Sequence, residues 1–293
     1  MRYTLFILAF LFGLISNSLL AQVITDANFA NAIRINCPAC IDANNKLTPA
    51  ADTLTRLDLG RREIKSLDGF NFSNLRYFDC SYNQLAELPN CKLNKLKIFY
   101  CYYNQLTKLP NYNFRNLEKF NCLGNQLTEL PAYDFKNLIS FVCSDNQLKK
   151  LPAYNFEKLK IFFCDNNQLT QLPAYNFKNL TTFICGSNQL TELSAYNFEK
   201  LTQFNCSNNP ITKLPAYNFN NVKEIYCENT LITTFAPYNL KNVQHCYLSN
   251  NKLSKLPPLS IALATLYIKG NNLICIPNLP NAQIDVELPV CKD

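Results

Sequence analysis

A strict 21-residue repeat constrains the fold of this chain more than any other feature of its sequence. Residues 117–137 read LEKFNCLGNQLTELPAYDFKN, and residues 138–158 read LISFVCSDNQLKKLPAYNFEK. Self-similarity with a period of roughly 20–50 residues is typical of solenoids, in which one unit cannot bury its apolar side chains alone and stacks on its neighbours. The sequence therefore predicts a one-dimensional stack of repeats rather than a globular domain.

The repeat frame extends over residues 54–274 of the 293-residue chain. We number each unit from its first residue; positions 1, 4, 6, 9, 11, 14 and 19 are nearly constant in type. The units, about eleven in all, begin at Leu54, Leu75, Leu96, Leu117, Leu138, Leu159, Leu180, Leu201, Val222, Val243 and, one residue early, Leu263.

Positions 3 to 6 of each unit show the alternation of a short β-strand. Positions 4 and 6 are apolar and are expected to point inward, whereas positions 3 and 5 vary and are expected to point outward. Position 4 is Phe in most units, and position 19 provides a second column of mostly Phe. Parallel strands stack about 4.8 Å apart, so the two columns predict continuous aromatic spines within the core.

The remainder of the unit predicts turns. Asn at position 9 is expected to be buried, which is tolerated if its amide bonds to backbone groups and so forms an Asn ladder. Thr230 interrupts this ladder and Pro210 follows Asn209, so local distortion is expected there. Pro at position 15 predicts turns or short extended segments on the convex side. The Tyr column at position 17 is expected to be half-buried with hydrated hydroxyls.

Eight of the fourteen cysteines occupy position 6, and they invite two interpretations. They are Cys80, Cys101, Cys122, Cys143, Cys164, Cys185, Cys206 and Cys227. A metal or redox site is one interpretation, but structural zinc needs four converging ligands, whereas a ladder places thiols in a file. The favoured interpretation is a small apolar core residue, so we expect no metal and no cofactor. Cys246 is expected to be buried, and Cys91 is a candidate accessible thiol.

The two ends of the chain depart from the repeat. Residues 1–21 have a basic start, an apolar run and a small residue before Gln22, as in a secretory signal peptide. Residues 22–53 and 275–293 are interpreted as N- and C-terminal caps. Because exported chains form disulfides, Cys37 and Cys40 are one candidate pair, with a redox motif as the alternative, and Cys275 and Cys291 are another. We expect a secreted or envelope (periplasmic) protein without a membrane span after signal removal.

Composition argues against several functions. The formal net charge of +7 is spread evenly, whereas nucleic-acid binding calls for clustered Lys and Arg, so no nucleic acid is expected. The chain has only six Gly and no phosphate-cradling loop. His245 is the single His and falls at an outward position, and the carboxylates do not form a converging pair. The sequence therefore predicts a protein that is not an enzyme.

The outward positions carry the candidate binding residues. Large apolar and aromatic side chains there are not required by the repeat, and an exposed apolar stripe on a sheet is typical of a protein-binding surface. The alternative is that β-forming residues fill strand positions through propensity alone. The candidates are Tyr77, Ile98, Tyr100, Tyr102, Tyr103, Ile161, Phe163, Ile184, Tyr226, Tyr247 and Tyr267, with Tyr82 beside the first group.

The repeat frame and the ends together resemble those of secreted bacterial leucine-rich repeat proteins of the internalin-like type. The resemblance covers roughly residues 24–275 and includes the opening run Leu54-Thr-Arg-Leu-Asp-Leu59. It implies a leucine-rich repeat horseshoe, mostly β and irregular within the α+β class, with one parallel sheet on the concave face. It also implies protein or glycan binding at a cell surface. The 21-residue period and the Phe and Cys columns depart from the internalin pattern.

The resulting hypothesis is a non-enzymatic, exported binding module that recognises a protein partner through its concave face. One alternative is an adhesion or envelope scaffold that binds glycans through its aromatic residues. A second alternative is a thiol-based redox or metal protein that uses the Cys ladder, which would require ladder thiols to react in the native state.

Overall fold

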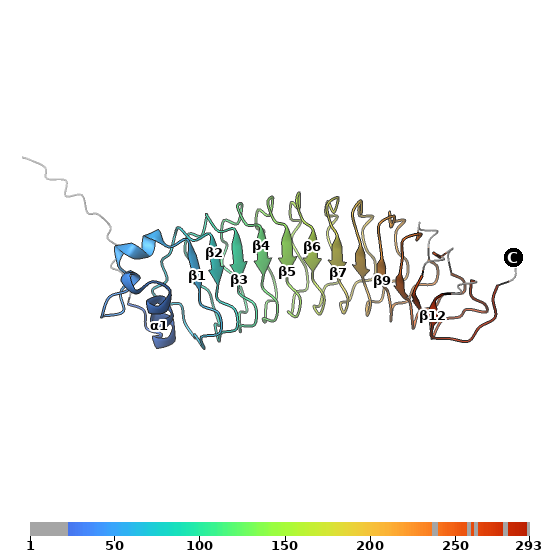
Figure 1. Cartoon of the computed structure of the whole chain (residues 1–293), viewed down its shortest axis with the longest axis horizontal. Helices are drawn as coiled ribbons and strands as arrows, with labels where there is room; N and C mark the ends of the chain where they lie inside the picture. The colour runs from blue at the N-terminus through green and yellow to red at the C-terminus, as the bar shows by residue number, and fades with distance from the viewer. Residues whose placement is uncertain (1–22, 236–239, 257–258, 261–262, 278–280, 292–293) are drawn as a thin grey trace, which may run out of the picture.

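The computed structural model describes residues 23–235, 240–256, 259–260, 263–277 and 281–291, so the predicted signal peptide lies outside the described residues. The chain forms an elongated stack in which the strands lie side by side along one side (Figure 1). A short helix lies at the N-terminal end of the stack, and β12 lies near the other end (Figure 1). The predicted solenoid with one parallel sheet is confirmed.

The described residues form one α-helix, two short 3₁₀ helices and a parallel sheet whose strands follow the chain order. The helix α1 is Ala27–Asn36, and the 3₁₀ helices are Pro38–Cys40 and Pro49–Thr53. The strands are β1 Arg56–Asp58, β2 Tyr77–Asp79, β3 Ile98–Tyr100, β4 Lys119–Asn121, β5 Ser140–Val142, β6 Ile161–Phe163, β7 Thr182–Ile184, β8 Gln203–Asn205, β9 Glu224–Tyr226, β10 His245–Tyr247, β11 Thr265–Tyr267 and β12 Gln283–Ile284.

Each strand from β1 to β11 occupies positions 3 to 5 of its unit, one residue shorter than the predicted 3 to 6. Position 4 is buried and positions 3 and 5 remain partly accessible, as the alternation predicts. Equivalent positions pair throughout, for example Phe141 with Phe162 and Phe162 with Phe183. The register is also continuous from β8 through β9 to β10, so the distortion expected around Pro210 and Thr230 does not interrupt the sheet. One strand, β12, lies in the segment interpreted as a C-terminal cap.

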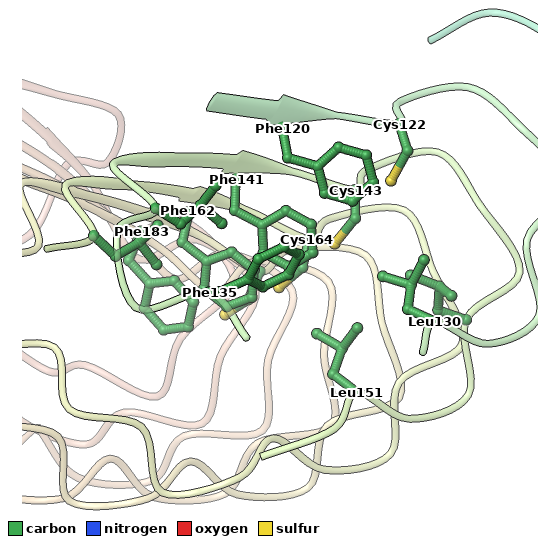
Figure 2. Close-up of a cluster of buried hydrophobic side chains, with 14 of the residues drawn as sticks. Phe120, Cys122, Leu130, Phe135, Phe141, Cys143, Leu151, Phe162, Cys164 and Phe183 are labelled. Atoms are coloured by element: carbon green, nitrogen blue, oxygen red, sulfur yellow. The ribbon is translucent and has the colours of Figure 1, made fainter. Parts of the chain in front are cut away.

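The core is built from columns of identical side chains. Figure 2 shows the position-4 rings of Phe120, Phe141, Phe162 and Phe183 in one file, with Cys122, Cys143 and Cys164 in a second file beside them. The rings of Phe141 and Phe162 are 5.4 Å apart and nearly parallel, at 7°. The position-19 ring of Phe135 packs on Phe141 at 5.3 Å. Burying each Phe contributes about 1.5–3 kcal/mol, which is gained only when neighbouring units stack.

The position-9 side chains form the expected Asn ladder. Asn146 Nδ2 donates to the carbonyls of Cys122, Cys143 and Ser144 at 3.0–3.2 Å. Its Oδ1 accepts from the backbone N–H of Leu127 at 3.0 Å. Each Asn therefore joins its own unit to the preceding unit by polar bonds that a buried amide requires.

In the unit with Thr230, the hydroxyl partly replaces the missing amide. Thr230 is buried, and its hydroxyl donates to Asn251 Oδ1 of the next unit. Asn251 Oδ1 also accepts from the backbone N–H of Ile232. A threonine cannot reproduce the donors of an asparagine, so this unit has fewer side-chain bonds to the unit before it.

The Tyr column at position 17 corrects the expectation of half-buried rings with hydrated hydroxyls. Tyr133 and Tyr154 are buried, with exposed fractions of 4% and 6%. The Tyr133 hydroxyl donates to the carbonyl of Pro110 at 2.8 Å, and Tyr154 donates to Pro131 at 3.1 Å. Since each acceptor belongs to the preceding unit, this column is a second inter-unit ladder.

Side chains from the N-terminal segment cover the open edge of β1. Asn36 at the end of α1 donates from Nδ2 to the Asp58 carbonyl at 2.9 Å, and its Oδ1 accepts from the Asp58 N–H at 3.4 Å. One amide thus replaces the strand that β1 lacks on that side, which protects an exposed edge from pairing with other chains. Asp26 caps α1 through Oδ1, and its Oδ2 accepts from the N–H groups of Lys65 and Ser66.

The structure pairs the terminal cysteines in the predicted way. The sulfurs of Cys37 and Cys40 are 1.98 Å apart, and those of Cys275 and Cys291 are 2.01 Å apart. The one α-helix in the described part of the chain, α1, has ten residues and is too short to span a bilayer.

Candidate binding surface

The outward side of the sheet, which we call the concave face, consists of positions 3 and 5 of every strand. The candidate residues fall into three groups along the sheet, as their positions in the sequence indicated. The first group lies on β2 and β3, the second on β6 and β7, and the third on β9 to β11. Polar side chains separate them, with Lys119, Asn121 and Ser140 after the first group and Gln203 and Asn205 after the second.

The first group is a connected tyrosine cluster that extends beyond the strands. Tyr77 and Tyr100 project from β2 and β3, with ring centroids 6.0 Å apart. Tyr102 and Tyr103 lie at positions 7 and 8, in the turn that follows β3. Tyr102 contacts Tyr100 at 6.1 Å and Tyr103 at 5.9 Å. The cluster therefore wraps from the concave face onto the neighbouring turns.

Two arginines complete this cluster, and the sequence reasoning did not identify them. The guanidinium of Arg56 lies 3.6 Å from the centroid of the Tyr77 ring, and that of Arg61 lies 3.7 Å from the Tyr82 ring. Such contacts stabilise by about 0.5–1 kcal/mol at exposed sites. Arg56 also bonds to Asp58 at 3.4 Å. The repeat frame could have identified them, because Arg56 and Arg61 occupy positions 3 and 8 of the first unit, which are the positions of Tyr77 and Tyr82 in the next unit.

The second group is apolar. Val142, Phe163 and Ile184 occupy paired positions on β5, β6 and β7, so their side chains lie in one row across the sheet. Ile161 lies in the parallel row beside Thr182. All of these side chains are partly accessible, whereas their inward neighbours Phe162 and Phe183 are fully buried.

The third group is a file of three tyrosines. The rings of Tyr226 and Tyr247 stack at 4.7 Å with an interplanar angle of 4°, and Tyr267 meets Tyr247 edge-on at 5.2 Å. Glu224 accepts a bond from the Tyr226 hydroxyl at 3.2 Å. Partial burial, and then the negative charge of Glu224, raise the pKa of Tyr226 to about 12. The hydroxyl is therefore protonated at neutral pH and acts as a donor.

His245 lies on β10 in this region, at outward position 3. Its Nδ1 is 3.1 Å from Thr265 Oγ1. Its neighbour in the sheet toward the N-terminus is Glu224 of β9. The side chain thus forms part of the concave surface, next to the third group.

The Cys ladder is buried beneath the concave face. The thiol of Cys80 donates to the carbonyl of Tyr100 at 3.5 Å, and Cys143 donates to Phe163 at 3.5 Å. Burial raises the pKa of the Cys101 and Cys164 thiols well above its usual value. Because the thiolate is the reactive form and the metal ligand, these thiols are unsuited to either chemistry. Within the described residues, no group of His, Cys, Asp and Glu side chains could hold a metal ion.

Cys91 differs from the ladder cysteines because it is only partly buried. Burial still raises its pKa to about 11. Cys91 is therefore partly accessible, and its thiolate fraction at neutral pH is small, which makes the thiol a weak nucleophile.

A shallow hollow of about 470 Å³ lies between the second and third units, away from the concave face. Its lining comes from positions 13 to 16 of both units and includes Leu88, Pro89, Leu109 and Pro110. It contains none of the candidate binding residues. The rest of its lining is polar and consists of Glu87, Asn90, Lys108 and Asn111.

Comparison with known proteins supports the repeat assignment. Two family models match, "Leucine Rich repeats (2 copies)" over residues 178–218 and "Leucine Rich Repeat" over residues 242–264. No curated protein matches the sequence.

Solved structures of bacterial proteins share the fold. YopM from Yersinia enterocolitica WA-314 is 24% identical with a TM-score of 0.62, covering 81% of this chain and 58% of that one. The functional domain of InlJ from Listeria monocytogenes, described as including a cysteine ladder, is 19% identical with a TM-score of 0.53, covering 89% and 70%. A leucine-rich repeat protein from Bacteroides eggerthii DSM 20697 is 19% identical with a TM-score of 0.52, covering 74% and 53%.

The parallel sheet, the 21-residue unit and the two matching family models identify the fold as a leucine-rich repeat solenoid. In fold it resembles bacterial leucine-rich repeat proteins of the internalin and effector type, at about 20% identity. The chain spans 58% of the length of the YopM structure that it matches.

Proposed function

We propose that the protein is an exported, non-enzymatic binding module that recognises a protein partner through its concave face. The observation that carries this proposal is the set of large side chains at outward positions, such as Tyr100, Phe163 and Tyr247, which the buried core does not need. Tyrosine offers a large, rigid contact area with a polar hydroxyl and loses little entropy on binding. Aromatic residues and arginine are also enriched at protein interfaces.

The relatives are consistent with this role. YopM from Yersinia pestis is described as a leucine-rich effector protein, and the InlJ structure is described as a functional domain. Both family models that match are repeat models rather than enzyme models. Extended solenoid surfaces commonly serve as binding surfaces for other proteins.

Export is the second part of the proposal. Residues 1–21 would act as a signal peptide that is cleaved after Ala21, and the chain would then reside in the envelope or outside the cell. In an oxidising compartment, Cys37–Cys40 and Cys275–Cys291 would be disulfides that fix the caps at residues 22–53 and 275–293. Mass spectrometry of the exported protein tests both points, through the N-terminal residue and through the masses of the linked peptides.

The binding test compares the mature wild-type protein with two variants. The first, Tyr100→Ala with Phe163→Ala, removes an outward side chain from each of two groups. The second, Lys149→Ala with Lys150→Ala, changes exposed residues outside the strands and serves as the matched control. We expect wild type and control to capture the same protein from whole-cell and extracellular extracts, and the concave variant to lose it while remaining folded. Equal capture by all three would refute recognition through the concave face.

A further inference from the structure

Position 8 of the repeat has an unusual backbone conformation, and most units have a small or polar residue there. Its φ is positive in every unit from the first to the last, between 51° and 64° except for 76° at Gly270. This left-handed region suits glycine and asparagine, and a bulky side chain there is an outlier. In chain order the residues are Arg61, Tyr82, Tyr103, Gly124, Asp145, Asn166, Ser187, Asn208, Asn229, Asn250 and Gly270.

In the C-terminal half, this position has a local structural function. Asn166 donates to Asp145 Oδ1 at 2.8 Å, and Asn229 donates to Asn208 Oδ1 at 2.9 Å. Asn250 continues the series by donating to Asn229 Oδ1 at 2.8 Å. These residues accept the backbone conformation and link successive units through an exposed polar ladder.

In the N-terminal half, the same position holds a stack of large side chains instead. The guanidinium of Arg61 covers the Tyr82 ring at 3.7 Å, and the Tyr82 and Tyr103 rings are 4.8 Å apart. The next position-8 residue, Gly124, lets the Tyr103 ring lie against its backbone, because a Cβ at residue 124 would be 2.6 Å from that ring. The fold accepts Asn, Asp, Ser or Gly at this site, so the two tyrosines are not there to satisfy the backbone.

These tyrosines are also unusually accessible. Tyr82 is 37% exposed and Tyr103 is 43% exposed, and they are the only exposed aromatic side chains among the described residues. Tyr102 joins them, with its ring 5.2 Å from Tyr82 and nearly perpendicular to it, at 78°. We call Arg61, Tyr82, Tyr102 and Tyr103 the aromatic rim. Strained backbone combined with exposed aromatic area indicates a functional surface.

The way the rings pack indicates the chemistry of the partner. Arg61 belongs to the unit before Tyr82 and Tyr103 to the unit after it, so both faces of the Tyr82 ring are occupied. Sugar recognition by an aromatic residue uses an open ring face, which this stack does not offer at Tyr82. What remains accessible is the ring edges, the phenolic hydroxyls and the N–H groups of the guanidinium.

The charges point to an acidic ligand. Arg61 makes no ion pair with any described residue, whereas Arg56 is paired with Asp58. The nearby carboxylate of Asp79 already accepts bonds from the Ser81 backbone and hydroxyl. A guanidinium held over an aromatic ring keeps its planar fork of N–H donors available, and such a fork can bind a carboxylate through two parallel bonds.

We propose that the aromatic rim is the docking surface for an acidic segment of a protein partner. Arg61 binds an Asp or Glu side chain of that segment, and the edges of Tyr82, Tyr102 and Tyr103 pack against its neighbouring apolar side chains. This inference rests on the proposed protein-binding function and adds a contact at the N-terminal rim to the recognition proposed for the concave face.

The test begins with a selection of random 12-residue peptides displayed on phage against the immobilised mature protein. We expect the enriched peptides to contain Asp or Glu beside an apolar residue. The best peptide is then titrated by fluorescence anisotropy against wild type, Arg61→Gln and Tyr82→Asn with Tyr103→Asn. The last variant introduces the residue that the fold itself uses at this position, so it should unfold at the same temperature as wild type or higher.

Each rim variant should bind the peptide about 10-fold more weakly or worse. Arg61→Gln should also reduce the dependence of affinity on salt, since it removes the charge contact. A matched control, Asn229→Ser, changes position 8 in the C-terminal half and should leave affinity unchanged.

The proposal is overturned if no acidic peptide is enriched, if the tyrosine variant binds as wild type does, or if free sugars compete with the peptide. These outcomes separate the rim from the broader function. If the natural partner is retained by Tyr82→Asn with Tyr103→Asn but lost by Tyr100→Ala with Phe163→Ala, concave recognition stands and the rim inference fails. If both variants retain the partner, both proposals fail.

Discussion

Phe162 and Phe163 are adjacent on strand β6 and have opposite environments. Phe162 is fully buried and stacks between Phe141 and Phe183, at 5.4 and 5.7 Å. Phe163 lies on the concave face in a row with Val142 and Ile184 and is partly accessible. The inward position repeats the same residue along most of the stack, whereas the outward position changes from unit to unit. Packing therefore accounts for the first residue and leaves the second available for recognition.

The largest expected effect comes from removing an inward ring. Phe162→Ala should lower the free energy of unfolding by about 3–5 kcal/mol, because it opens a cavity in the aromatic column. Phe163→Ala should lower it by about 1 kcal/mol or less, since this side chain is already partly hydrated. Denaturant unfolding of the two variants measures the difference. Similar losses would show that the outward residue belongs to the core.

The Asn ladder should show the next largest effect. Asn146→Ala removes four bonds and leaves the N–H of Leu127 without its acceptor, whereas the carbonyls of Cys122, Cys143 and Ser144 each keep another donor. The loss should cost about 2–3 kcal/mol. The control Asn155→Ala changes an exposed asparagine that bonds only to the Glu157 side chain. Its unfolding midpoint should match that of wild type within experimental error. An equal midpoint for Asn146→Ala would contradict the role assigned to the ladder.

Removing single hydroxyls tests the distinction between buried and exposed tyrosines. Tyr133→Phe deletes the bond to the Pro110 carbonyl and should cost about 1 kcal/mol. Tyr103→Phe deletes a hydroxyl from an exposed ring and should leave stability unchanged. Thermal unfolding compares the two. A larger loss for Tyr103→Phe would contradict the assignment of Tyr133 as a buried structural residue and Tyr103 as an exposed one.

The stabilisation that Asp26 provides at the N-terminal end should be lost in acid. Burial acts to raise the pKa of Asp26, but bonds from the N–H groups of Phe29, Lys65, Ser66 and Asn28 outweigh it, so the pKa is lowered. A lowered native pKa stabilises the fold above the unfolded value, near 4, and this stabilisation is lost as the pH falls through the native value.

The experiment is the pH dependence of unfolding for wild type, Asp26→Asn and the exposed control Glu129→Gln. Wild type and control should lose stability together below about pH 4. Asp26→Asn should start lower at neutral pH and fall less steeply in acid. A steep acid loss retained in Asp26→Asn would assign the effect to other carboxyl groups.

The smallest effect concerns the ladder thiols, which should not react with a thiol reagent in the native state. Ten cysteines lie outside the two terminal pairs, and nine of them are buried. A thiol reagent at neutral pH should label none of the ladder cysteines and should label Cys91 slowly, because its pKa is about 11. Unfolding should expose all ten to the reagent. Rapid labelling of several ladder cysteines in the folded protein would revive the redox alternative.

Much of the fold could be predicted from the sequence because the same residue types recur at the same positions in about ten units. Phe at position 4 and Asn at position 9 recur where the core needs a ring and an amide, so their burial followed from the pattern. The bond from the Tyr133 hydroxyl could not be predicted, because it depends on how closely the Pro110 carbonyl of the preceding unit approaches. The twist and spacing of neighbouring units set that distance.

The candidate surface was less predictable because its residues do not repeat. The sequence indicated which side chains face outward and that they form three groups along the chain, but it did not indicate how the rings contact one another within a group. Arg61 was missed because the first unit departs from the consensus. The contact of the Arg61 side chain with the Tyr82 ring is visible only in the structure. The backbone conformation of position 8 likewise appears only in three dimensions.

The central claim is that a partner protein contacts the outward side of β6, and photo-crosslinking tests it most directly. A benzophenone side chain is placed at residue 163 in one protein and at residue 150, an exposed position outside the strands, in another. Both are irradiated in the extracts that supply the captured partner. The account predicts a cross-linked partner from residue 163 and none from residue 150. A cross-link from residue 150 alone would contradict it.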